Sequence, residues 1–147
     1  MIRPARPEEA SAVAAITLRA YAHYVERIGR RPAPMDADYD ELVAAGRVFV
    51  SVVDGEVAGA IVLARYDDHL LVENVAVDPR FQKRGLGRAL LAFAEDEARA
   101  QGIGILRLYT NVLMVENIAL YTRLGWRETE RRSERDFARV FFEKRLE

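Results

Sequence analysis

A strand, a basic loop with two glycines and a helix follow one another directly between residues 70 and 91. This run constrains the fold more than any other part of the chain. It reads LLVENVAVDPRFQKRGLGRALL, where the apolar stretch Leu70–Val77 predicts a buried strand that Pro79 closes. Gly85 and Gly87 then precede an amphipathic helix. Backbone N–H groups at a helix start have no intrahelical partner and lie at the positive end of the helix dipole. The segment therefore predicts an anion-binding loop that joins a strand to a helix.

The rest of the chain alternates between helical and extended patterns. Apolar residues at helical spacing predict a helix from about residue 7 to 28, and further helices are predicted over 39–45, 86–102 and 117–124. Strands are predicted over residues 1–4, 47–53, 56–66, 70–77, 105–110, 126–131 and 139–144. Asp54-Gly55 favours a tight hairpin turn. This order implies a mixed sheet with helices on its faces.

Length and composition are those of an ordinary globular domain. The chain has 147 residues, half of them hydrophobic and 31% charged, which predicts a single domain over residues 1–147. A formal net charge of −1 provides no general attraction for nucleic acid or an anionic membrane. The chain has no cysteine, and His23 and His69 lack partners at ligand spacing, so no metal site is expected. Without a signal peptide or a membrane-length apolar stretch, the expected location is cytoplasmic.

Two well-known phosphate-binding motifs do not match the glycine loop. The Walker pattern G-x-x-x-x-G-K-[ST] is absent from the chain. A dinucleotide fingerprint requires a third glycine and follows the first strand, whereas Gly85-x-Gly87 is followed by Arg88-Ala89-Leu90 and comes after the fourth predicted strand.

Two blocks of the sequence instead resemble the GNAT superfamily of N-acetyltransferases. The block V-x-V-D-P-x-x-Q-x-x-G-x-G, from Val75 to Gly87, is similar to the acetyl-coenzyme A signature of that family. The second block runs from Asn117 through Tyr121 to Gly125-Trp126. With the order of strands and helices, the resemblance covers essentially the whole chain. It implies an α/β (α+β) fold with a mixed, mostly antiparallel sheet of six to seven strands flanked by four helices.

The resemblance also implies an activity, the transfer of an acetyl group from acetyl-CoA to a primary amine by direct attack in a ternary complex. In the family, the backbone of the fourth strand pairs with the pantetheine arm and the loop amides hold the pyrophosphate. The residues predicted to bind acetyl-CoA are Asn74, Val75, Ala76, Val77, Gln82, Lys83, Arg84, Gly85, Leu86, Gly87, Arg88, Asn117 and Tyr121.

Some of these residues have a second interpretation. The three basic side chains of the loop are either phosphate contacts or a solvated face. Asn117 either caps its helix or binds the pantetheine arm. Strand alternation places Glu73, Val75 and Val77 on one face and Val72, Asn74 and Ala76 on the other. A bulge, which is typical of the family in this strand, would disturb that alternation.

Acetyl transfer to an amine requires removal of an ammonium proton and protonation of the leaving thiolate. Tyr121 is the predicted general acid, because the family commonly places a tyrosine there near the coenzyme sulfur. The alternative is an aromatic that only packs. Glu73 is the predicted general base, since a carboxylate in an otherwise apolar strand requires a reason. The alternatives are a surface acid or one that positions substrate by charge.

The acceptor is the part of the function that the sequence describes least. Tyr21, Tyr24 and Asn111 are predicted to contact it, although an asparagine in the position of Asn111 often serves a turn. Basic and acidic side chains both occur between the first two predicted helices: Arg27, Arg30, Arg31, Asp36, Asp38 and Asp40. Charge therefore does not decide between an anionic and a cationic amine, or between a small molecule and a protein. A homodimer is left open.

Two other classes of protein are weighed against the enzyme. A non-catalytic acyl-CoA sensor would keep the loop and lose turnover, and the presence of Tyr121 and Glu73 argues against it. A nucleic-acid-binding module is disfavoured by the balanced charge.

Overall fold

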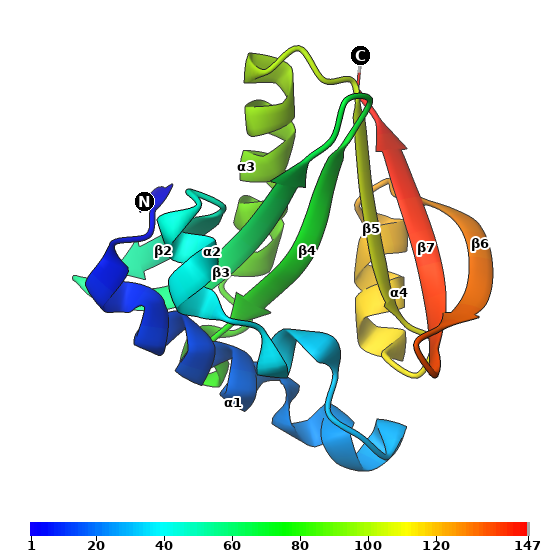
Figure 1. Cartoon of the computed structure of the whole chain (residues 1–147), viewed down its shortest axis with the longest axis horizontal. Helices are drawn as coiled ribbons and strands as arrows, with labels where there is room; N and C mark the ends of the chain where they lie inside the picture. The colour runs from blue at the N-terminus through cyan, green and yellow to red at the C-terminus, as the bar shows by residue number, and fades with distance from the viewer. Residues whose placement is uncertain (147) are drawn as a thin grey trace.

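The computed structural model describes residues 1–146, which form one seven-stranded sheet with helices on both faces (Figure 1). The strands are β1 (Ile2–Pro4), β2 (Val48–Val53), β3 (Glu56–Arg65), β4 (Leu70–Val77), β5 (Ile105–Asn111), β6 (Arg127–Glu134) and β7 (Phe137–Arg145). The helices are α1 (Ala10–Ile28), α2 (Tyr39–Ala44), α3 (Leu86–Ala100) and α4 (Val115–Arg123), with short 3₁₀ segments at Pro7–Glu9, Ala33–Asp36 and Pro79–Phe81. The predicted class and the predicted order of elements are confirmed.

The order of strands across the sheet is β1-β2-β3-β4-β5-β7-β6. Neighbouring strands are antiparallel except for β4 and β5, so the sheet is mixed and mostly antiparallel, as expected. The parallel ladder joins only Leu70–Val72 to Leu106–Leu108. Beyond that ladder β4 and β5 diverge, as Figure 1 shows at the centre of the molecule. The second half of β4 therefore has a strand partner only in β3 among residues 1–146.

A β-bulge interrupts β4 at Glu73. Asn74 pairs with Val62 and Val72 pairs with Leu63, so that Glu73 between them has no partner in β3. An extra residue in one strand turns the following side chains to the other face. The bulge expected in this strand is confirmed.

The bulge also corrects the simple alternation expected for β4. Val72 packs in the same core cluster as Val75 and Val77, on the side covered by α3. Ala76 packs with Ile16 of α1 on the opposite side. The expectation that Val72 shares a face with Ala76 is therefore wrong, because the extra residue lies between them.

Two hydrophobic layers hold the helices against the sheet. Leu90, Leu91, Ala94 and Ala98 of α3 are all buried in the largest core cluster. Helices α1 and α2 cover the other face (Figure 1). No helix within residues 1–146 has the length and apolarity needed to cross a bilayer.

Local sequence explains both the hairpin turn and the shifted boundaries. Asp54 and Gly55 have φ angles of 52° and 77°, which is the left-handed geometry that a two-residue hairpin turn requires. α1 begins later than expected because Glu9 accepts the Arg6 N–H at 2.8 Å and closes a 3₁₀ turn first. β6 is longer than expected because its mostly exposed sequence, RETERRSE, has no apolar alternation to mark its extent.

Candidate active site

The loop between β4 and α3 presents a row of backbone amides without partners. None of the N–H groups from Gln82 to Arg88 has a hydrogen-bond acceptor among residues 1–146, and the first helical bond runs from Ala89 N–H to the Gly85 carbonyl at 3.0 Å. Lys83 and Gly85 have left-handed φ angles of 65° and 77°. Such residues turn successive N–H groups toward a common point, which is how backbone nests bind phosphate. The loop therefore has the geometry expected of an anion site.

Exposed cations surround these amides. Lys83, Arg84 and Arg88 are exposed, and none of them forms an ion pair within residues 1–146. The Arg84 guanidinium lies 5.3 Å from the centre of the Phe81 ring. These side chains have positive charge available for a diphosphate.

The packing of the protein itself does not require a glycine at position 87. A Cβ atom built on Gly87 would meet only Val77 Cγ2, at an ordinary distance of 3.8 Å. The space beside this backbone is therefore open on the side away from the core. A ligand that approaches the start of α3 closely would use that space.

Asp78 fixes the start of this loop, and the sequence analysis missed that role. Its side chain is fully buried and accepts hydrogen bonds from Arg19 Nη2 at 2.7 Å, Arg80 N–H at 3.0 Å and Arg80 Nη2 at 3.0 Å. Burial alone would raise the pKa of Asp78, but these hydrogen bonds outweigh it and hold the pKa well below its usual range. An Asp before Pro at a strand end, able to accept the N–H two residues on, was the available signal.

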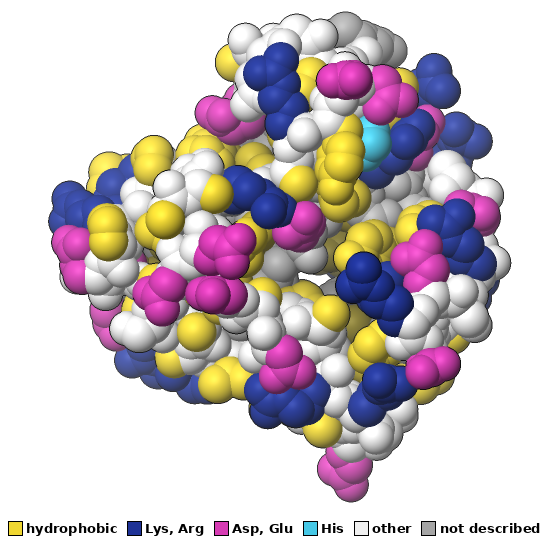
Figure 2. All heavy atoms as spheres, in the orientation of Figure 1, with side chains coloured by type: hydrophobic (Ala, Val, Ile, Leu, Met, Phe, Trp, Pro, Cys, Tyr) yellow, Lys and Arg dark blue, Asp and Glu magenta, His cyan; other side chains and the backbone are white. Residues whose placement is uncertain are grey.

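A cavity of about 290 Å³ lies in the opening between β4 and β5. Figure 2 shows that this face of the molecule is hollowed near its centre. Side chains from α1, β4, α4 and β7 line the cavity, including Tyr21, Glu73, Asn74, Asn117, Tyr121 and Arg139. The splayed strands thus bring together residues that are distant in the sequence.

Tyr121 lies on the wall that α4 contributes. Its ring packs edge-on against Phe142, with 5.7 Å between centroids, and against Trp126 at 6.2 Å. Its hydroxyl has no hydrogen-bond partner among residues 1–146. Burial, and then the neighbouring Tyr24, raise the pKa of Tyr121, so the phenol keeps its proton at neutral pH. The group is placed to donate a hydrogen bond or a proton into the cavity.

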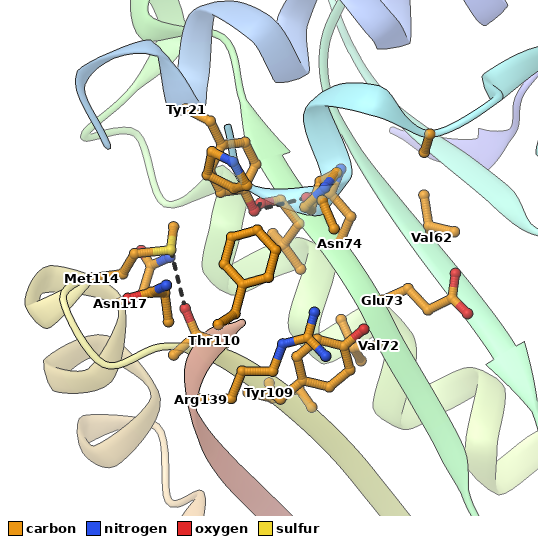
Figure 3. Close-up of a pocket in the computed structure, with 18 of the residues that line it drawn as sticks. Tyr21, Val62, Val72, Glu73, Asn74, Tyr109, Thr110, Met114, Asn117 and Arg139 are labelled. Atoms are coloured by element: carbon orange, nitrogen blue, oxygen red, sulfur yellow. Dashed lines mark hydrogen bonds between the residues drawn. The ribbon is translucent and has the colours of Figure 1, made fainter. Parts of the chain in front are cut away.

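Asn74 lies at the centre of a buried polar network. The Tyr21 hydroxyl donates to Asn74 Oδ1 at 2.8 Å, as Figure 3 shows, and Asn74 Nδ2 donates to the Tyr39 hydroxyl at 3.2 Å and to Thr17 Oγ1 at 3.4 Å. The network joins β4 to α1 and α2 and rigidifies one wall of the cavity. Its side-chain role was not anticipated, since Asn74 was expected to act through its backbone.

Glu73 is partly exposed at the bulge and lines the cavity. Arg47 Nη2 lies 2.6 Å from Glu73 Oε2, although the two are not aligned as a hydrogen bond. Oε1 has no partner among residues 1–146. Figure 3 shows the carboxylate pointing away from Thr110 and Asn117.

Of the two roles considered for Asn117, capping of α4 is wrong. The helix begins at Val115 with Met114 at the N-cap, so Asn117 already lies inside the first turn. Its side chain lines the cavity instead. Asn111 has the turn role that the sequence suggested, since its Oδ1 accepts the Leu113 N–H at 2.9 Å, and it also lines the cavity.

Tyr21 lines the cavity but Tyr24, the other tyrosine predicted to contact an acceptor, does not. The Tyr24 hydroxyl lies 3.4 Å from Glu116 in α4, and burial together with that carboxylate raises the pKa of Tyr24 to about 12. Arg27 also pairs with Glu116, at 2.6 Å. These residues hold α1 against α4.

Two arginines of the β6–β7 hairpin, Arg135 and Arg139, also line the cavity, although the sequence did not indicate them. The Arg139 guanidinium lies over the Tyr109 ring, 4.4 Å from its centre (Figure 3). No sequence signal places these residues beside β4, because the strand order that does so is a property of the whole sheet. Within residues 1–146, no three His, Asp or Glu side chains gather as a metal site.

Known proteins resemble this chain in sequence and in fold. The model of the acetyltransferase (GNAT) family matches residues 13–126. A [ribosomal protein bS18]-alanine N-acetyltransferase of Escherichia coli (strain K12) is 37% identical over 75 residues, 51% of this chain and 51% of that protein. A streptothricin acetyltransferase of Streptomyces lavendulae is 35% identical over 86 residues, 56% of this chain and 46% of that protein. The chain thus spans about half the length of the curated relatives it matches.

Among solved structures, PaiA N-acetyltransferase from Thermoplasma acidophilum in complex with coenzyme A has a TM-score of 0.84 to this chain. The match covers 99% of this chain and 98% of that one at 15% sequence identity. The fold that the sequence blocks implied is confirmed.

Proposed function

We propose that this chain, which belongs to the acetyltransferase (GNAT) family, transfers an acetyl group from acetyl-CoA to a primary amine. The observation that carries the proposal is the row of unpartnered amides at Gln82–Arg88. From this loop, the edge of β4 that β5 leaves open leads to the cavity lined by Tyr121. A long donor would fit with its phosphates at the loop, its extended arm along β4 and its reactive end in the cavity.

The donor is proposed to lie along β4 and the start of α3. Among residues 1–146, no β5 residue pairs with residues 74–77, and at this edge the Val75 and Val77 carbonyls accept only side-chain hydrogen bonds, from the Tyr21 hydroxyl at 3.3 Å and Gln82 Nε2 at 3.4 Å. The donor arm would replace these contacts, and the amides of residues 82–88 would hold the pyrophosphate. Lys83, Arg84 and Arg88 would add charge-assisted contacts. Acetyl-CoA supplies the thioester carbonyl that the acceptor attacks.

The amine attacks in a ternary complex, so that a C–N bond forms as the C–S bond breaks. The thiolate that leaves has a pKa of about 8.5 and takes a proton from a donor. Tyr121 is that donor in the proposed mechanism, because its hydroxyl lines the cavity and is protonated at neutral pH. The proton that the acylated nitrogen loses then restores the Tyr121 hydroxyl, so that the products are the amide and the thiol. Asn117, on the same wall of the cavity, would bind the donor arm.

A primary ammonium has a pKa of about 10.4 and must lose a proton before it attacks. Glu73 is proposed to take this proton through water, using the oxygen that Arg47 does not contact. Arg47 holds the carboxylate in place from the other side. The proposal matches the position of Glu73 at the bulge, where the strand edge meets the cavity.

The names of the relatives point to different acceptors. One is named for an alanine of a ribosomal protein and another for streptothricin. For this chain the proposal is therefore limited to a primary amine, and the cytoplasm remains the expected location.

Calorimetric titration with acetyl-CoA tests the donor site. Gly87→Val is expected to weaken binding at least tenfold, because its side chain fills the space beside the amides. Gly104→Val, at another position where a Cβ meets nothing within 4 Å, is the matched control and is expected to bind normally. Absence of binding to the unaltered protein would overturn the proposed function.

Thiol release across a panel of primary amines then tests turnover. Release that depends on the amine supports acetyl transfer. Tight donor binding with no release for any amine would favour the acyl-CoA sensor instead.

A further inference from the structure

The charged groups of the cavity have an uneven balance. Among residues 1–146, the charged side chains that line it are Glu73, Arg135 and Arg139. Glu73 is matched by Arg47 at 2.6 Å. Arg135 forms no ion pair within the described chain. Because Arg47 balances Glu73 and Glu134 balances Arg139, the unmatched charge at the cavity is positive and belongs to Arg135.

Arg139 is the best placed of these groups. It extends from β7 and is only 8% exposed. Its guanidinium lies 4.4 Å from the centre of the Tyr109 ring and 5.5 Å from that of Phe137. Nη1 donates to Glu134 Oε1 at 2.8 Å. Two aromatic rings and one carboxylate thus fix the orientation of the guanidinium.

The other edge of this guanidinium is unused. Arg139 Nε and Nη2 have no hydrogen-bond partner among residues 1–146, and neither is sealed away from solvent. These two N–H groups point the same way and match the two oxygens of a carboxylate. An oriented, largely buried arginine with one edge open to a cavity is a built carboxylate site.

We propose that the acceptor is an amine that also carries a carboxylate, which Arg139 binds through Nε and Nη2. The proposal rests on the proposed acetyl transfer and names the acceptor class for the same cavity. The carboxylate lies at the β7 wall, and the amine is directed toward the α4 wall where Tyr121 lies. Arg135, in the turn between β6 and β7 with a φ of 49°, adds positive charge at the cavity rim.

The remaining walls fit the rest of such an acceptor. Pro32, Ala33 and Pro34, before α2, line the cavity together with Phe137, and they offer apolar surface to a side chain. A polyamine is matched less well, because the cavity has a single carboxylate, Glu73, whose charge Arg47 balances, whereas Arg135 forms no ion pair within residues 1–146. The basic residues Arg27 and Arg31, which left the question open in the sequence, pair with Glu116 and Asp36 and do not line the cavity.

A carboxylate-bearing amine can be a free amino acid or the N-terminus of a peptide with an acidic residue. Two pairs of acceptors separate these sources by thiol release. L-phenylalanine is compared with 2-phenylethylamine across pH, so that the ionisation of each amine is accounted for. The amidated dipeptide Ala-Glu is compared with amidated Ala-Gln, which has the same α-amine.

In at least one pair the carboxylate-bearing acceptor is expected to have a kcat/KM about 10- to 100-fold higher, the range for a charge-assisted contact. Arg139→Gln is expected to abolish that preference through KM while acetyl-CoA binding, measured by calorimetry, is unchanged. Arg139→Lys keeps the charge but loses the paired N–H groups, so its preference is expected to lie between those of the unaltered protein and Arg139→Gln. Arg131→Gln, on the same hairpin but outside the cavity, is the matched control and keeps the preference.

Equal kcat/KM within both pairs overturns the carboxylate site and leaves the proposed acetyl transfer unaffected. If the unaltered protein does not bind acetyl-CoA, both the carboxylate site and the proposed acetyl transfer are overturned. Arg139→Gln could fail to fold, and two other variants then serve. Arg135→Gly removes the charge at the cavity rim and accommodates the left-handed backbone at that position, and Arg139→Lys removes the paired N–H groups. If both variants keep the full preference for the carboxylate-bearing acceptor, the proposal is overturned. Titration of each pair into the CoA-saturated protein provides a readout without turnover, and equal affinities there also overturn it.

Discussion

The proposed donor loop consists of backbone groups, whereas the proposed acceptor end of the cavity consists of side chains. At Gln82–Arg88 the groups that would face a ligand are consecutive amides, whose positions depend on left-handed residues and on Asp78. At the acceptor end they are single side chains from α1, β4 and β7. A site made of backbone tolerates side-chain change, and a site made of side chains does not. The two ends can therefore change independently, with the donor kept and the acceptor altered.

The largest expected effect is at the side-chain end. Tyr121→Phe removes the proposed proton donor and should lower kcat by about 10²-fold or more, with a much smaller change in acetyl-CoA affinity because the ring that lines the cavity is kept. Stopped-flow thiol release and calorimetry measure the two quantities. Tyr66→Phe, at an exposed tyrosine, is the control. Full turnover by Tyr121→Phe would show that this side chain only packs.

A backbone site should be most sensitive to the residue that holds its backbone. Asp78→Asn removes a fully buried charge that binds Arg19 and Arg80, and should lower the free energy of unfolding by about 2 kcal/mol while weakening acetyl-CoA binding. Chemical denaturation and calorimetry measure these effects. Asp96→Asn, at a side chain that is 80% exposed, should change neither. Normal donor affinity in Asp78→Asn would mean that the loop keeps its shape unaided.

Low pH should destabilise the protein at carboxylates whose pKa the fold lowers, such as Glu9 at the start of α1. Hydrogen bonding by Arg3, opposed by burial, lowers the pKa of Glu9 to about 2. A lowered folded-state pKa means that the stabilisation is present above the unfolded value of about 4.5 and is lost as pH falls toward 2. The loss from Glu9 should be on the order of 1 kcal/mol after solvent screening. Glu9→Gln should flatten the pH dependence of denaturation, and an unchanged slope would contradict this assignment.

The smallest effect is expected for single loop cations. Lys83→Gln should weaken acetyl-CoA binding only about two- to threefold, because an exposed charge contributes little beside the amides and is screened by salt. Calorimetry at low and high salt measures it, with the difference shrinking at high salt. If Lys83→Gln weakened acetyl-CoA binding as much as Gly87→Val, the donor end would depend on side chains as well, which would contradict the contrast between the two ends.

The same contrast explains what the sequence predicted. The donor loop could be predicted because its residues are consecutive and because the glycines and the strand end are recognisable in the local sequence. The acceptor end could not be predicted from local sequence. Tyr21 and Asn74 are 53 residues apart in the chain, and Arg139 lies beside the cavity only because of the strand order. The start of α4 was predicted at Asn117 instead of Val115, because Met114 at the N-cap makes no side-chain cap that would mark it. The bulge at Glu73 was expected from the resemblance, whereas its consequence for Val72 required the register.

The three residue pairs between β4 and β5 have a mechanical consequence. They are the only ladder within residues 1–146 that joins β1–β4 to β5–β7, so beyond them the two parts of the sheet are joined by side-chain packing and not by backbone hydrogen bonds. A donor lying along the open edge of β4 would add hydrogen bonds at that edge and strengthen the connection between the two parts. Heat would then unfold the loaded protein as one unit, at a higher temperature and over a narrower range than the empty one.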